Sequence, residues 1–79
     1  MPTLLNWRRY KLLFYSREPG EPPHVHVLKG PRQLKVWLSD LTVARNAGFA
    51  DHEVNAILKK EGREKDHFTK AWYDFFGNR

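Results

Sequence analysis

The chain contains no cysteine, which excludes disulfide bonds, a thiolate nucleophile and any cysteine-ligated zinc site. A secreted domain of 79 residues would usually need such cross-links, so a reducing, cytoplasmic compartment is expected. Long apolar runs are missing as well. No uncharged stretch reaches the roughly 18 residues needed to span a bilayer, and residues 1–9 lack the apolar segment of a signal peptide. Neither secretion nor a membrane partner is therefore expected.

The chain also lacks internal repeats, low-complexity tracts and linker-like stretches, so residues 1–79 are expected to form a single small domain. A domain of this size has a thin core. Aromatic residues make up 14% of the chain, and their large rings supply much buried area.

Acidic residues are fewer than basic ones. The chain has 14 lysines and arginines against 9 aspartates and glutamates, which gives a net charge of +5. Residues 1–40 carry net +4 of this charge, and residues 41–79 only net +1. Such a balance favours a nucleic-acid partner, RNA or DNA, or an acidic protein.

The first half of the sequence predicts three strands. Residues 10–16 are rich in aromatics, whereas residues 17–23 contain three prolines and a glycine that prevent regular structure. Residues 24–28 and 33–39 have alternating β-branched and apolar side chains, which is typical of strands. The segment between them contains Gly30 and is expected to be a tight turn.

A two-residue loop at Gly30 and Pro31 assigns the faces of this hairpin. It places Val27 opposite Leu34 and Val25 opposite Val36. Because side chains alternate along a strand, one face is then wholly aliphatic and forms the core face. The other face carries a mixed set of side chains, most of them polar or aromatic: His24, His26, Leu28, Gln33, Lys35, Trp37 and Ser39.

The second half of the sequence predicts helix. Residues 41–49 are expected to be a connection with room for a short helical turn. From Asp51 onward the apolar spacing is three to four residues. Gly62 interrupts this stripe, which predicts one kinked helix or two helices, over about 51–61 and 63–76, that end at Gly77. The expected fold is α+β: a small antiparallel three-stranded sheet whose aliphatic face is covered by the C-terminal helices.

Two histidines and a lysine are the candidate catalytic residues. His24 and His26 follow two prolines and point to the same side of one strand. With Lys35, Arg17 or Arg32 as the cation beside a phosphate, they could act as base and acid in metal-independent RNA cleavage. The simpler interpretation is that they are hydrogen-bonded surface or boundary residues, or groups at an interface. A metal site needs a third ligand that this face does not supply, so no metal or cofactor is expected.

Further basic and aromatic residues are candidates for binding nucleic acid or a partner. Trp37 could stack on a base or anchor a protein interface. The basic candidates are Arg8, Arg9, Arg17 and Arg32. Arg8 and Arg9 lie between Trp7 and Tyr10, a mixture of charge and rings that suits single-stranded nucleic acid, although a solvated strand entry with Trp7 in the core is the simpler interpretation. The alternating charges of residues 59–66 are typical of a solvated helix surface.

Several strings resemble one bacterial family of unknown function, the domain of unknown function 4160. They are Met1-Pro-Thr, residues 10–16, Glu21-Pro-Pro-His-Val-His-Val-Leu-Lys-Gly30, Lys35-Val-Trp-Leu38, Arg45-Asn-Ala-Gly-Phe49 and Ala71-Trp-Tyr-Asp-Phe-Phe-Gly77. The resemblance implies a small prokaryotic protein, often encoded beside a second small protein, in gene pairs suspected to be toxin–antitoxin modules.

Two functions follow as hypotheses. The first is one component of a two-gene, toxin–antitoxin-like module that binds or acts on nucleic acid, with metal-independent RNA cleavage as its enzymatic form. The second is a non-enzymatic adaptor, the antitoxin half, that binds a small cognate protein from the neighbouring gene through the His/Trp sheet face. The sequence leaves open whether the protein is an enzyme.

Overall fold

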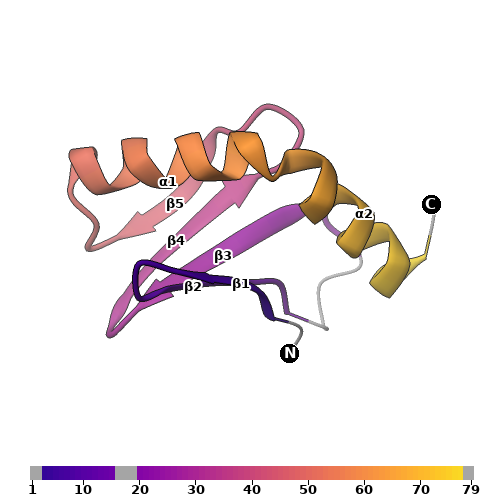
Figure 1. Cartoon of the computed structure of the whole chain (residues 1–79), viewed down its shortest axis with the longest axis horizontal. Helices are drawn as coiled ribbons and strands as arrows, with labels where there is room; N and C mark the ends of the chain where they lie inside the picture. The colour runs from indigo at the N-terminus through magenta and orange to yellow at the C-terminus, as the bar shows by residue number, and fades with distance from the viewer. Residues whose placement is uncertain (1–2, 16–19, 78–79) are drawn as a thin grey trace.

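The computed structural model of the chain describes residues 3–15 and 20–77. Over these residues a five-stranded antiparallel sheet is followed by two helices (Figure 1). Each strand pairs with its neighbour in sequence, in the order β1-β2-β3-β4-β5. The elements are β1 (Thr3–Trp7), β2 (Tyr10–Leu13), β3 (His24–Lys29), β4 (Arg32–Trp37), β5 (Val43–Ala47), α1 (Asp51–Arg63) and α2 (Lys65–Phe76). The α+β class with helices after the sheet is confirmed.

The expected number of strands is wrong, because β1 and β5 add to the three that the sequence predicts. β1 was missed because its turn has no usual signal: Arg8 and Arg9, with φ of 49° and 67°, stand where Asn-Gly is typical. β5 was missed because all five of its residues are exposed, so no side-chain alternation marks it. The segment 41–49 is therefore not a simple connection, since it contains a strand.

The predicted hairpin between β3 and β4 is confirmed. Lys29 pairs with Arg32, Val27 with Leu34 and Val25 with Val36, which is the register of a two-residue loop. Gly30 has a φ of 58°, a conformation that favours glycine. The aliphatic face is fully buried and is joined in the core by Leu12, Ile57 and Phe68.

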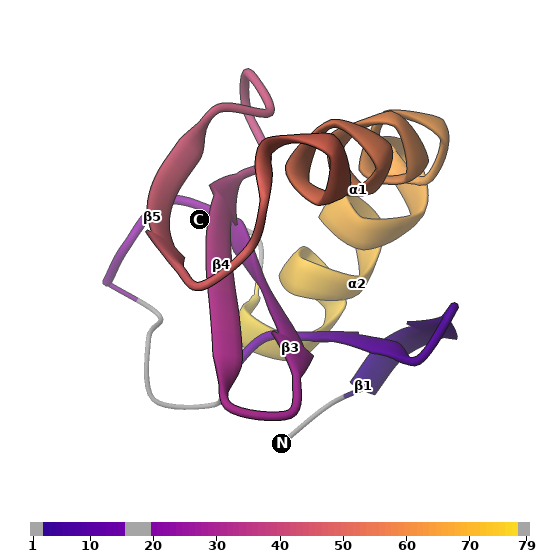
Figure 2. The same ribbon diagram turned by 90° about the vertical axis from the view of Figure 1, so that its left-hand side faces the viewer.

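Two helices cover this core face, and the boundary between them differs slightly from expectation. The break falls at Glu64 rather than at Gly62, which stays inside α1. The Glu64 amide donates to the carbonyls of Lys60 and Glu61, at 3.2 and 3.1 Å, which closes the last turn of α1. Gly77, with a φ of 91°, ends α2 as predicted. Figure 2 shows both helices on one side of the sheet, with β5 and β1 at opposite edges.

Neither α1 nor α2, the helices of the described residues, is long and apolar enough to cross a membrane.

Candidate nucleic-acid interface

The two histidines of β3 differ sharply in their surroundings. His24 has no exposed surface, whereas His26 is half-buried. The His24 ring centroid lies 4.9 Å from that of Trp72 in α2, so the expectation that His24 points away from the helices is wrong. The reason is the break at Glu64: α2 turns away from the line of α1 towards the end of the sheet where β3 begins (Figure 1).

The hydrogen bonding of His24 is equally constrained. Its Nδ1 lies 2.8 Å from the carbonyl oxygen of Pro22. A carbonyl only accepts, so Nδ1 carries the proton and donates it to Pro22. Burial beside Trp72, together with this bond, gives His24 the surroundings of a packing residue.

His26, Lys35 and Trp37 do lie together, on the sheet face away from α1. His26 pairs with Lys35 in the β3–β4 register. The Lys35 Nζ donates to the Glu21 carboxylate at 2.6 Å and lies 4.7 Å from the Trp37 ring centroid. These groups border a hollow of about 360 Å³, the outer hollow, lined by Glu21, His26, Gln33, Leu34, Lys35, Trp37, Ala44 and Arg45. The positive charge of Lys35 is offset by Glu21, so this hollow is only weakly basic.

Arg32 is held in a different network, at the start of α1. Its Nη1 donates to Glu53 Oε1 at 3.0 Å, and the Tyr10 hydroxyl donates to Glu53 Oε2 at 2.9 Å. The Ala50 amide also donates to the same carboxylate, at 3.2 Å. These bonds, the Ala50 amide first, hold the pKa of Glu53 below its usual value. Arg32 therefore joins the hairpin to α1. Arg17, another basic candidate, lies outside the described residues.

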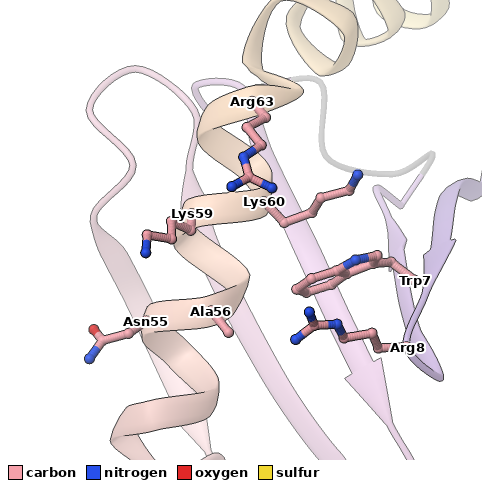
Figure 3. A pocket seen from close by; sticks show the side chains of 7 residues that line it. All are labelled: Trp7, Arg8, Asn55, Ala56, Lys59, Lys60 and Arg63. Carbon is pink, nitrogen blue, oxygen red and sulfur yellow. The ribbon is translucent and has the colours of Figure 1, made fainter.

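A second, larger cavity lies between the β1–β2 turn and α1, and we call it the Trp7 pocket (Figure 3). Its volume is about 430 Å³, and it is lined by Trp7, Arg8, Asn55, Ala56, Lys59, Lys60 and Arg63. Four of these side chains are cationic and none is acidic. Glu64, 3.6 Å from Lys60, partly offsets this charge from outside the lining.

The local structure explains how these cations come to line one pocket. Asn55, Lys59 and Arg63 are spaced four residues apart, so they form one row along α1. Figure 3 shows Trp7 and Arg8 extending from the β1–β2 turn towards α1, with Lys60 reaching towards the indole and Lys59 pointing away from it. The Arg8 guanidinium lies 4.8 Å from the Trp7 ring centroid and the Lys60 ammonium 6.0 Å from it, so the indole holds both cations by cation–π attraction.

The sequence indicated only part of this pocket. Arg8 was a candidate beside Trp7, but the residues from α1 were interpreted as a plain solvated surface. The four-residue spacing of Lys59 and Arg63 was a signal of a basic row. Trp7 and Arg8 reach this row only because β1 pairs with β2, and the sequence did not predict β1.

Backbone strain marks the same place. Arg8 and Arg9 both adopt left-handed conformations, at about 1 kcal/mol or more each for residues other than glycine. Such strain tends to persist at functional sites. By contrast, the described residues contain no cluster of three side chains suited to hold a metal ion.

The geometry thus defines a small α+β domain with a basic, indole-containing pocket at one edge of its sheet. A family model, the domain of unknown function DUF4160, matches residues 10–73, and the chain belongs to this family. No curated protein matches the chain. No solved structure matches it either.

Proposed function

We propose that this protein binds nucleic acid through the Trp7 pocket, as one component of a two-protein, toxin–antitoxin-like module. The observation that carries the proposal is a pocket lined by four cations from two distant segments, two of them close to the Trp7 indole, with no carboxylate in the lining. Phosphate groups of a nucleic-acid backbone are the common polyanions that such a cluster suits. The cognate protein from a neighbouring gene is the partner that the family resemblance implies.

The strained turn supports the proposal independently. An Asn-Gly pair would relieve the left-handed conformations of Arg8 and Arg9. Retaining two arginines there is costly to stability, which is understandable if their charge is needed for binding. Arg9 is exposed beside the pocket and extends the basic surface around the turn.

Binding without cleavage is the form that the geometry supports better. Acid–base cleavage of RNA needs two groups that touch the substrate. His24 is buried behind Trp72, and Lys35 is paired with Glu21 on the opposite face from the Trp7 pocket. A substrate bound at the outer hollow would reach His26 but not His24 without rearrangement.

The test measures binding of a fluorescein-labelled single-stranded RNA of about 20 nucleotides by anisotropy. With about four phosphate contacts, affinity is expected to fall about 50-fold between 50 and 200 mM salt. The variant Lys59→Glu/Arg63→Glu should weaken binding at least tenfold at 50 mM salt. Lys70→Glu, compared with each of the single variants Lys59→Glu and Arg63→Glu, is the matched control, because Lys70 is exposed on α2 away from the pocket. Equal affinity of wild type and the double variant, or an equal loss in the control, would contradict the proposal.

A further inference from the structure

The β5 edge of the sheet is open. β5 is the last strand in the sheet order, and no described element pairs with its outer side. All five of its residues are exposed, and Val43 keeps 39% of its surface accessible. An edge strand of this kind presents unpaired backbone amides and carbonyls, to which an extended chain can add as a further strand.

The charge at the centre of this edge selects what can add to it. Arg45 is the middle residue of β5 and is exposed. Among the described residues it has no ion-pair partner, whereas the cross-strand neighbour Lys35 is held by Glu21. An acidic side chain placed opposite Arg45 on an added strand would therefore gain a charge pair, and a basic one would be repelled.

The same residue disfavours a second copy of this chain. Two β5 strands that pair antiparallel about a two-fold axis through their centres bring Arg45 directly opposite Arg45. Like charges in that position destabilise a sheet. A register shift between Lys35 and Val36 also interrupts the regular hydrogen-bonding ladder between β4 and β5. Such irregularities reduce the tendency of an edge strand to pair with any other strand.

A place for an apolar side chain lies beside this edge. The outer hollow of about 360 Å³ is lined by Ala44 and Arg45 of β5 and by Trp37 of β4. Side chains two residues apart on a strand lie on the same face. An added strand can therefore set one acidic side chain near Arg45 and a neighbouring apolar one near Trp37, a residue type that often anchors interfaces.

We propose that β5 binds an extended, acidic segment of a different protein, which adds to the sheet as a sixth strand. The backbone of β5 supplies the hydrogen bonds, Arg45 selects acidic over basic or self strands, and the Trp37 side of the outer hollow takes an apolar side chain. This site is independent of the Trp7 pocket, which lies at the opposite, β1 edge of the sheet.

The test uses the full chain, labelled with ¹⁵N, and a synthetic seven-residue peptide in which threonine alternates with glutamate or valine, so that one face of the peptide carries both glutamate and valine. Amide hydrogen exchange is measured residue by residue with and without peptide at millimolar concentration. We expect exchange at residues 43–47 to slow about tenfold while α1 is unaffected. The same peptide with N-methylated amides on one edge keeps its charge but loses its hydrogen bonds, and it should give no protection.

A charge exchange tests selection by Arg45. Arg45→Glu should weaken the acidic peptide at least tenfold and gain binding of the matching peptide with lysine in place of glutamate. Lys70→Glu, an equal change of charge at an exposed position of α2, should leave both affinities unchanged. Unchanged exchange at residues 43–47, equal binding of the N-methylated peptide, or the same affinity in Arg45→Glu would overturn the proposal. So would protection of these residues by self-association or by a single-stranded RNA instead of the peptide.

Discussion

Among the described residues, Glu61 is the titratable group whose pKa is shifted most, and neutralising it should stabilise the fold. Its side chain faces inward from α1 with no exposed surface. Neither carboxylate oxygen has a hydrogen-bond partner among the described residues. Burial raises the pKa of Glu61 from 4.5 to about 8, because the charged form loses its hydration. The group is therefore mostly protonated in the folded protein at neutral pH, but ionised in the unfolded chain.

The magnitude follows from this difference in pKa. Below pH 4.5 both states are protonated and Glu61 imposes no penalty. As pH rises towards about 8, the folded state must hold a proton that the unfolded state releases, and stability falls. At pH 7 the penalty is about 3 kcal/mol, from about 1.4 kcal/mol for each unit of pKa difference. That is a large part of the 5–15 kcal/mol that is typical for a whole domain.

Glu61→Gln keeps the shape of the protonated acid and removes the titration. Urea unfolding at pH 5, 6, 7 and 8 should show the variant more stable by about 3 kcal/mol at pH 7, a gain that shrinks to about 1 kcal/mol at pH 5. In thermal unfolding the gain at pH 7 corresponds to roughly 12–24 °C. Glu61→Leu should show the same trend with pH. A variant no more stable than wild type at pH 7, with a constant difference from pH 5 to 8, would refute the assignment of a buried, neutral Glu61.

Two other predictions concern residues that the sequence singled out or overlooked. His24→Ala should lower stability by about 2–3 kcal/mol because it empties a buried site against Trp72, whereas His26→Ala should lower it less. Unfolding in urea compares the two variants, and equal losses of stability would count against a packing role for His24. Glu53→Gln should lower the urea midpoint at pH 7, since it weakens the bonds that join Tyr10 and Arg32 to α1. Because the pKa of Glu53 is lowered on folding, the wild-type advantage should be present above the usual carboxyl pKa and be lost as the pH falls through the folded value; an advantage that persists in acid would contradict this.

The parts of the fold that the sequence predicted are those that side-chain patterning determines. Alternating aliphatic residues and Gly30 defined the β3–β4 hairpin, and the apolar spacing after Asp51 defined the helices. β5 carries no such pattern because it is exposed throughout, and the turn of β1 uses two arginines in a conformation that glycine and asparagine normally occupy. Local sequence could not indicate either strand.

The candidate site was predictable to a similar extent. His26, Lys35 and Trp37 share the face expected of them. His24 shares this face as well, with its ring 5.0 Å from that of His26 and 5.6 Å from that of Trp37. It is nevertheless covered by Trp72 of α2, which parity along the strand does not reveal. The Trp7 pocket joins Trp7 and Arg8 to the Lys59 and Arg63 row across the fold, so its existence depends on tertiary packing that no motif records.

The strained turn offers the sharpest test of nucleic-acid binding at the Trp7 pocket. Replacing the turn by Asn-Gly, as Arg8→Asn/Arg9→Gly, should stabilise the fold by about 1–2 kcal/mol because the left-handed conformations are then relaxed. The same variant should bind single-stranded RNA at least tenfold more weakly at 50 mM salt and show a shallower dependence on salt. Greater stability with weaker binding is the predicted result. A variant that is more stable and binds RNA as tightly as wild type would contradict the proposed function.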